Sequence, residues 1–127
     1  MGMLFRGMRA DGNLPAIGVT ARTLGVRAGI DIPTVSDVVY PEQGGLSVAP
    51  DDPRRLPDFR RPSELGGTGK DPVFALDESD LGPDLNYRAD PLDPGRHGFI
   101  EPARVMTFRE YERALAATQV AWRRYRP

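Results

Sequence analysis

Thirteen prolines are spread along the 127 residues of this chain, and they restrict its fold more than any other feature. Proline breaks a helix because its ring removes a backbone hydrogen bond and clashes with the preceding turn. Few helical windows therefore remain, and a bundle of long helices is excluded. The 14 glycines lie between apolar runs without a repeat, which favours short strands joined by turns. The length predicts a single domain over residues 1–127.

The composition also excludes several kinds of site. The chain has no cysteine, so disulfides, thiolate zinc sites and cysteine nucleophiles are excluded, and a single histidine rules out a histidine-rich metal centre. We therefore expect no metal. No apolar run is long enough to span a membrane, and the first residues lack the basic and apolar regions of a signal peptide. The sequence predicts a cytoplasmic location and no membrane partner.

Charge is balanced overall but unevenly distributed. A net charge of −1 argues against general binding to nucleic acids. Seven acids fall within residues 71–93, and six arginines within residues 104–126. These blocks are typical of solvated faces, although the second could form a basic edge for an anionic ligand or an acidic partner. Every cation except Lys70 is an arginine, the better planar fork for phosphate.

The first predicted strand covers residues 3–8. Alternation places Leu4, Arg6 and Met8 on one face and Phe5 on the other. If Leu4 and Met8 face the core, Arg6 is buried as well and its guanidinium needs a partner. The alternative is an edge strand from which Arg6 reaches water.

Further short strands are predicted later in the chain. One begins at Leu46 after the Gly44-Gly45 pair, with Ser47 facing opposite to its neighbours. Residues 73–76, 85–88 and 97–101 are the others, and residues 51–65 are predicted as a surface excursion of loops or 3₁₀ turns. The glycine-rich run before Lys70 is no Walker site, because Asp71 follows it and no helix begins there.

The end of the chain predicts an amphipathic helix. Thr107 and Glu110 form a capping-box pattern that marks its start. A core-facing stripe of about five turns follows at helical spacing: Phe108, Tyr111, Leu115, Thr118, Trp122 and Tyr125. With the predicted strands, this makes the fold class α+β.

Three of these features resemble a known family. Arg6 in Leu4-Phe-Arg-Gly7, Ser47 in Tyr40-Pro-Glu-Gln-Gly-Gly-Leu-Ser-Val48 and Glu101 in the segment from His97 to Met106 resemble, in order, the R–S–E pattern of ADP-ribosyltransferases. The chain is more closely similar to small type VI-secreted toxins with an ADP-ribosyltransferase-like fold. That resemblance implies split, curved antiparallel sheets with the C-terminal helix packed behind them. It does not extend to residues 51–95.

The resemblance also implies a chemistry. Cleavage of the nicotinamide–ribose bond of NAD passes through an oxocarbenium-like transition state, which a carboxylate stabilises. Glu101 would take that role, Arg6 would bind the pyrophosphate or ribose, and Ser47 would steady the ribose or the glutamate. These three are the expected catalytic residues. The residues expected to bind NAD, which is the substrate, are Arg6, Tyr40, Gly45, Ser47 and His97.

Two departures from the family pattern qualify this assignment. Ser47 stands alone between Leu46 and Val48 where classical members have Ser-Thr-Ser. Phe99 occupies the position where arginine-modifying members have Glu or Gln, so arginine is not the expected acceptor. Structural roles also remain open: Ser47 as a strand-end cap, His97 as a core histidine and Glu101 as the ion-pair partner of Arg6.

The expected function is therefore that of an NAD-dependent mono-ADP-ribosyltransferase-like bacterial toxin acting in a cytoplasm. Its partners would be an antitoxin or immunity protein and a macromolecular acceptor that the sequence does not identify. The alternative is a non-catalytic interaction domain that keeps the fold without the chemistry.

Overall fold

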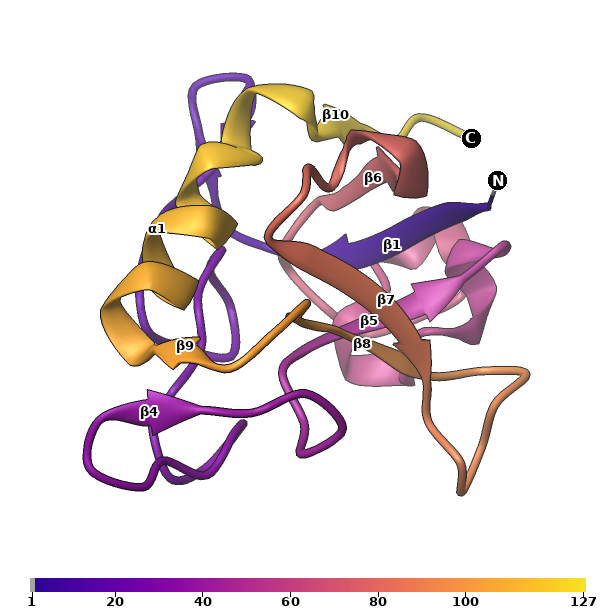
Figure 1. The fold of residues 1–127 in the computed structure, drawn as a ribbon. Coiled ribbons are helices and arrows are strands. Elements are labelled where there is room, and N and C mark those ends of the chain that lie inside the picture. Colours follow the sequence, from indigo (N-terminus) through magenta and orange to yellow (C-terminus); the bar gives the residue numbers. More distant parts are fainter. Residues whose placement is uncertain (1) are drawn as a thin grey trace.

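A computed structural model describes residues 2–127 and shows an α+β fold with short antiparallel strands and one α-helix near the C-terminus (Figure 1). The strands are β1 (Met3–Gly7), β2 (Ala10–Asp11), β3 (Leu14–Pro15), β4 (Val38–Val39), β5 (Leu46–Pro50), β6 (Val73–Asp77), β7 (Leu85–Ala89), β8 (Gly98–Pro102), β9 (Met106–Thr107) and β10 (Arg123–Arg124). The helix α1 covers Phe108–Ala117. Five 3₁₀ turns complete the fold: η1 (Pro53–Arg55), η2 (Asp58–Arg60), η3 (Ser63–Leu65), η4 (Glu78–Asp80) and η5 (Gln119–Ala121).

Six strands form the principal sheet, in the order β10-β6-β1-β5-β8-β7, and every neighbouring pair is antiparallel. Strand β5 joins two parts of this sheet. Its first three residues pair with β8, and its last two pair with β1. The chain therefore changes partners within one short strand, and the sheet divides at β5.

Apolar clusters lie on both faces of the sheet. The larger cluster contains Leu4, Phe74 and Ile100 from the strands, together with Tyr111 and Trp122 from the C-terminal region. The smaller cluster covers the other face, where Phe5 and Ala49 pack with Leu56 and Leu65. These two leucines belong to the 3₁₀ segment, which is the stretch of residues 53–65 that contains η1, η2 and η3. Leu4 and Phe5 thus belong to opposite clusters, as strand alternation predicts. Within residues 2–127, no helix has both the length and the apolar character needed to cross a membrane.

The strand predicted at residues 3–8 is confirmed, and it is an interior strand between β5 and β6. Arg6 is 7% exposed, so the alternative of an edge-strand arginine reaching water is wrong. The strands predicted near residues 46, 73, 85 and 98 are also confirmed, as are the 3₁₀ turns within residues 51–65.

The C-terminal helix begins where the capping box predicts but ends earlier than its apolar stripe suggests. The Thr107 side chain accepts a hydrogen bond from the Glu110 amide, and the Glu110 carboxylate accepts one from the Thr107 amide. The helix stops at Ala117, so the prediction of about five turns is wrong. Trp122 lies beyond it and is still buried, with its indole N–H donating to the Thr118 hydroxyl at 3.0 Å.

Candidate functional site

The candidate site is a cavity of about 540 Å³ between the principal sheet and three irregular segments. Strands β1 and β5 form its floor, and its walls come from residues 21–31, from the 3₁₀ segment and from the loop between β7 and β8. Its size lies within the range of small-molecule sites. Its polar and aromatic lining residues are Arg6, Arg27, Asp31, Ser47, Arg55, Phe59, Arg60, Asp90, Asp93, Arg96 and His97.

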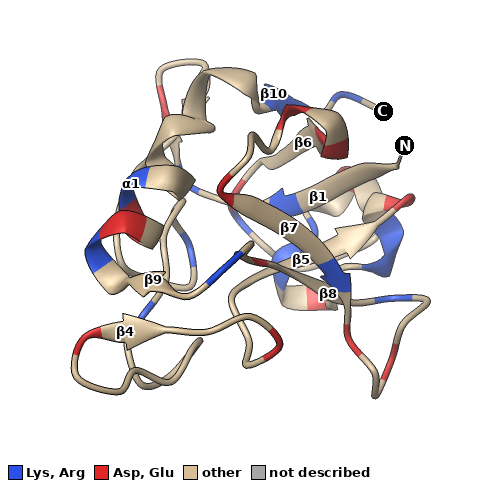
Figure 2. Ribbon diagram, viewed as in Figure 1, with Lys and Arg blue, Asp and Glu red and all other residues tan. Residues whose placement is uncertain are grey.

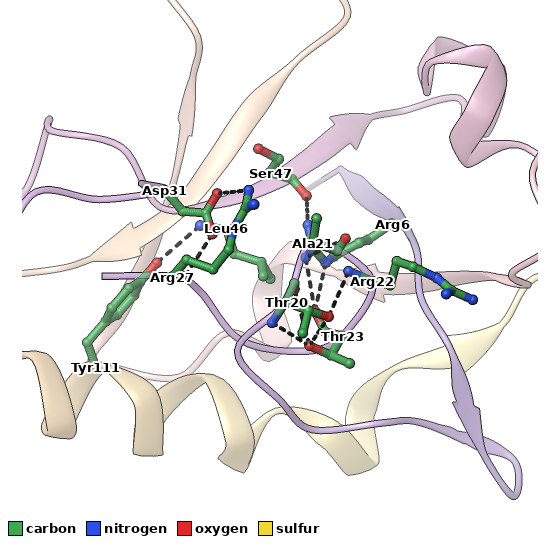
Figure 3. A network of polar contacts seen from close by, with 10 residues as sticks. All are labelled: Arg6, Thr20, Ala21, Arg22, Thr23, Arg27, Asp31, Leu46, Ser47 and Tyr111. Atoms are coloured by element: carbon green, nitrogen blue, oxygen red, sulfur yellow. Dashed lines mark hydrogen bonds and ion pairs between the residues drawn. The ribbon is translucent and has the colours of Figure 1, made fainter. Parts of the chain in front are cut away.

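Arg6 lines this cavity, but its guanidinium is largely committed to backbone carbonyls (Figure 3). Nε and Nη2 both donate to the Thr23 carbonyl, Nη2 also donates to Ala21, and Nη1 donates to the Ser47 carbonyl at 2.9 Å. Arginine has five N–H donors, so these four bonds leave one N–H on Nη1. Arg6 therefore ties the 20–23 turn to β5, and this buried cation has carbonyls, not a carboxylate, as its hydrogen-bond partners.

The charge of Arg6 is also affected by its surroundings. Burial lowers its pKa from 12.5 to about 10, the charge of Asp31 opposes that change, and the positive charge of Arg60 adds to it. Arg6 remains a cation at neutral pH, and the four hydrogen bonds to three carbonyls compensate for its lost hydration.

One ion pair and one carboxylate–histidine hydrogen bond lie in the cavity wall. Asp31 accepts two hydrogen bonds from the Arg27 guanidinium, at 3.0 and 2.9 Å, and one from the Arg27 amide. Asp90 lies 2.8 Å from His97 Nδ1, and the hydrogen bond with His97 is the main cause that lowers the Asp90 pKa. The His97 side chain is 35% exposed, so the interpretation as a core histidine is wrong.

Ser47 is exposed at the cavity, and its contact with Arg6 runs through its carbonyl. Within residues 2–127 its hydroxyl makes no hydrogen bond to the protein, so it does not act as a strand-end cap. Three of the predicted site residues, Arg6, Ser47 and His97, thus meet at one cavity.

Glu101 lies on β8 beyond Phe99 and does not line the cavity. It is 4% exposed, and its Oε1 accepts a hydrogen bond from Arg88 Nε at 2.8 Å and one from the Glu42 amide at 2.9 Å. The proposed ion pair with Arg6 is therefore wrong, because Arg88 on the neighbouring strand β7 is the partner. Glu101 holds the loop before β5 against the sheet.

Tyr40 and Gly45 belong to that same loop and also lie outside the cavity. Tyr40 is 41% exposed. Gly45 has a φ of +143°, and a Cβ there would lie 2.5 Å from the Ile100 carbonyl oxygen and 2.9 Å from the Tyr111 hydroxyl. The groups that approach Gly45 closely are the protein's own backbone and Tyr111.

Figure 2 shows Lys and Arg at positions spread over the ribbon, and five of these arginines, all outside the two charge blocks, line the cavity. None of the six arginines in residues 104–126 lines it, and Arg104 is instead paired with Asp84 at 2.6 Å. The lining residues that sequence reasoning missed are Arg27, Asp31, Arg55, Phe59, Arg60, Asp90, Asp93 and Arg96. The arginine-rich excursion at residues 51–65 was the one signal that could have indicated several of them.

Five guanidinium groups face this cavity against three carboxylates, so it carries a positive excess. Together with Ser47, His97 and an exposed aromatic ring, such a lining suits an anionic ligand that also has a flat ring. In the part of the chain that the structure describes, no three histidine, aspartate or glutamate side chains gather as a metal site. The chain matches no protein-family model, no curated protein and no solved structure in comparisons with each.

Proposed function

We propose that this protein is an NAD-dependent ADP-ribosyltransferase-like toxin that binds NAD in the cavity beside Arg6, Ser47 and His97. The observation that carries the proposal is the meeting of these three residues at one arginine-rich cavity of about 540 Å³. They come from distant parts of the sequence, and the resemblance to secreted toxins implies all three as site residues. The toxin role, an immunity protein and a macromolecular acceptor rest on that resemblance.

The cavity residues fit the parts of NAD. A diphosphate needs cationic N–H donors, which the arginines supply, and a ribose hydroxyl can hydrogen-bond with the Ser47 hydroxyl. His97, fixed by Asp90, can donate or accept at its free ring nitrogen. A nicotinamide or adenine ring can stack on the exposed Phe59. The bond cleavage itself needs a carboxylate near the developing positive charge, and the carboxylates at this cavity are Asp31, Asp90 and Asp93.

The second candidate is the non-catalytic interaction domain, and the position of Glu101 favours it. The carboxylate expected to assist catalysis is buried, bonded to Arg88 and to the Glu42 amide, and outside the cavity. A domain that retained the fold without the reaction could keep Glu101 for this structural purpose alone.

Titration calorimetry with NAD and mass spectrometry for free nicotinamide distinguish these two functions. The proposal expects NAD binding and nicotinamide release, both reduced in Ser47→Ala and unchanged in Ser63→Ala, an exposed serine outside the cavity. Binding without release favours the interaction domain, and absence of binding contradicts the proposal. Release that persists in Glu101→Gln would show that Glu101 is not the catalytic carboxylate.

Expression in a bacterial cytoplasm tests the toxin role separately. The proposal expects growth arrest that Ser47→Ala relieves and Ser63→Ala does not, with equal amounts of folded protein. Normal growth with the unsubstituted chain would contradict the toxin role.

A further inference from the structure

Two of the five arginines that line the cavity are free to bind a ligand. Arg6 is bonded to three carbonyls, Arg27 is paired with Asp31, and Arg55 donates to the Pro50 carbonyl at 3.1 Å and lies 3.5 Å from Asp51. Arg60 and Arg96 make no side-chain hydrogen bond or ion pair within residues 2–127.

Arg60 and Arg96 come from separate segments. Arg60 ends η2, and Arg96 lies in the loop between β7 and β8. The guanidinium carbon of Arg60 lies 5.0 Å from the centre of the Phe59 ring, which is 64% exposed. Asp93, whose carboxylate has no ion-pair partner among residues 2–127, lines the same cavity and offsets part of their charge.

Unpaired cations gathered at one cavity repel each other, and an anion relieves that repulsion. Arg60 is near enough to Arg6 that its charge lowers the Arg6 pKa, after the larger effects of burial and Asp31. An arginine that binds phosphate usually presents two parallel N–H donors, and Arg6 has only one N–H left over. Arg6 therefore cannot act as a bidentate phosphate fork while it holds the 20–23 turn.

We infer that Arg60 and Arg96 bind the diphosphate of a nucleotide, that Phe59 stacks on its base, and that Arg6 is a positioning residue which shapes the cavity without binding phosphate. This inference rests on the proposed function for the identity of the site, and it reassigns the phosphate contact that the resemblance gives to Arg6. The ligand class is a nucleoside diphosphate moiety, either free or within a dinucleotide.

Titration calorimetry with ADP and with inorganic pyrophosphate tests the two arginines. Each of Arg60→Gln and Arg96→Gln should weaken the binding of both probes about tenfold, as expected for the loss of a charge-assisted hydrogen bond at a partly exposed site. The matched control is Arg109→Gln, an exposed arginine of α1 outside the cavity, which should leave both affinities within a factor of two. Phe59→Ala should weaken ADP more than pyrophosphate, because only ADP carries a base.

Arg6→Lys tests the positioning role, because lysine keeps the charge but cannot reproduce the paired bonds to the Thr23 carbonyl. The variant should melt at a lower temperature, and below its melting transition it should bind pyrophosphate within a factor of two of the unsubstituted chain. The inference is overturned if folded Arg6→Lys loses pyrophosphate binding while Arg60→Gln and Arg96→Gln keep it. It is also overturned if the unsubstituted chain binds neither probe.

These outcomes separate the inference from the proposed function. Binding of ADP through Arg60 and Arg96 without nicotinamide release from NAD would contradict the transferase and leave the diphosphate site standing. Nicotinamide release that neither arginine substitution changes would contradict the diphosphate site at Arg60 and Arg96 and leave the transferase standing.

Discussion

At the scale of single residues, Arg6 and Glu101 show what a sequence can and cannot indicate about buried charge. The alternation in β1 left two possibilities, an Arg6 that is buried and needs partners or an edge-strand Arg6 that reaches water, and the structure shows the first. The partners themselves were not predictable, because they are backbone carbonyls and every residue has one. The partner of Glu101 was missed for a different reason: Arg88 becomes its neighbour only through the β7–β8 pairing.

The ion pair between Arg22 and Asp71 gives a prediction for acid stability. The hydrogen bond from Arg22 lowers the Asp71 pKa below 3.8, the value without such contacts. A carboxyl whose pKa is lower in the folded state stabilises the fold above its unfolded pKa, and this stabilisation is lost as the pH falls through the folded pKa. The free energy of unfolding should therefore decrease less steeply below about pH 4 in Asp71→Asn than in the unsubstituted chain.

Urea denaturation at a series of pH values measures this slope. Asp11→Asn, at an exposed position whose side chain makes no hydrogen bond or ion pair in the described part of the chain, is the control. If the free energy of unfolding decreases equally steeply at low pH in Asp71→Asn and in Asp11→Asn, the Arg22–Asp71 pair contributes nothing to stability.

Gly45 gives a second prediction at this scale. An alanine there would adopt a φ that L-residues avoid and would place its Cβ against the Ile100 carbonyl and the Tyr111 hydroxyl. Gly45→Ala should lower the free energy of unfolding by roughly 1–3 kcal/mol. Gly95→Ala, where a Cβ meets nothing within 4 Å, should change it by less than about 0.5 kcal/mol. Similar losses in the two variants, measured by urea denaturation, would contradict this account.

At the scale of elements, the first residue of the helix α1 was easier to predict than its last residue. The capping box at Thr107 and Glu110 is a local signal, and α1 begins where it stands. The apolar spacing continues to Trp122 and Tyr125, but the chain leaves the helix after Ala117 and β10 then pairs with β6. Both side chains still pack, Trp122 in the larger cluster and Tyr125 against the smaller one. The helical spacing of the apolar residues correctly predicted that both side chains pack against the core, but it wrongly placed them in the helix.

The capping box supplies the prediction for this scale. Thr107→Ala removes the side-chain acceptor for the Glu110 amide and should destabilise the protein by about 1 kcal/mol. Thr68→Ala, an exposed threonine without a side-chain hydrogen bond in the described residues, is the matched control and should have almost no effect. A loss in Thr107→Ala no larger than in the control, measured in urea, would mean that the cap adds no stability.

At the scale of the whole molecule, the α+β class followed from the sequence pattern and the antiparallel strands from the family resemblance, but neither indicated the cavity. Its floor comes from two strands and its walls from three separate segments of the chain, and no local sequence pattern indicates that these parts meet. The division of the sheet at β5 likewise depends on which strands pair, and strand periodicity carries no information on pairing.

Both faces of the sheet are covered by apolar clusters, and Trp122, the only tryptophan, is 1% exposed in the larger one. Unfolding should therefore be a single cooperative transition. Far-ultraviolet circular dichroism and Trp122 fluorescence should give the same midpoint in urea. Two separated midpoints would show that the clusters unfold independently.

The position of β1 has a consequence for how the protein is made. Residues 3–7 leave the ribosome before β5 and β6 do, yet their strand lies between these two strands, whose residues end at positions 50 and 77. The buried cation on β1 likewise needs the carbonyl of Ser47. Strand β1 therefore completes its pairing only after both neighbouring strands have been translated. A nascent chain that stops before residue 73 leaves one edge of β1 unpaired and exposed to other chains and to chaperones.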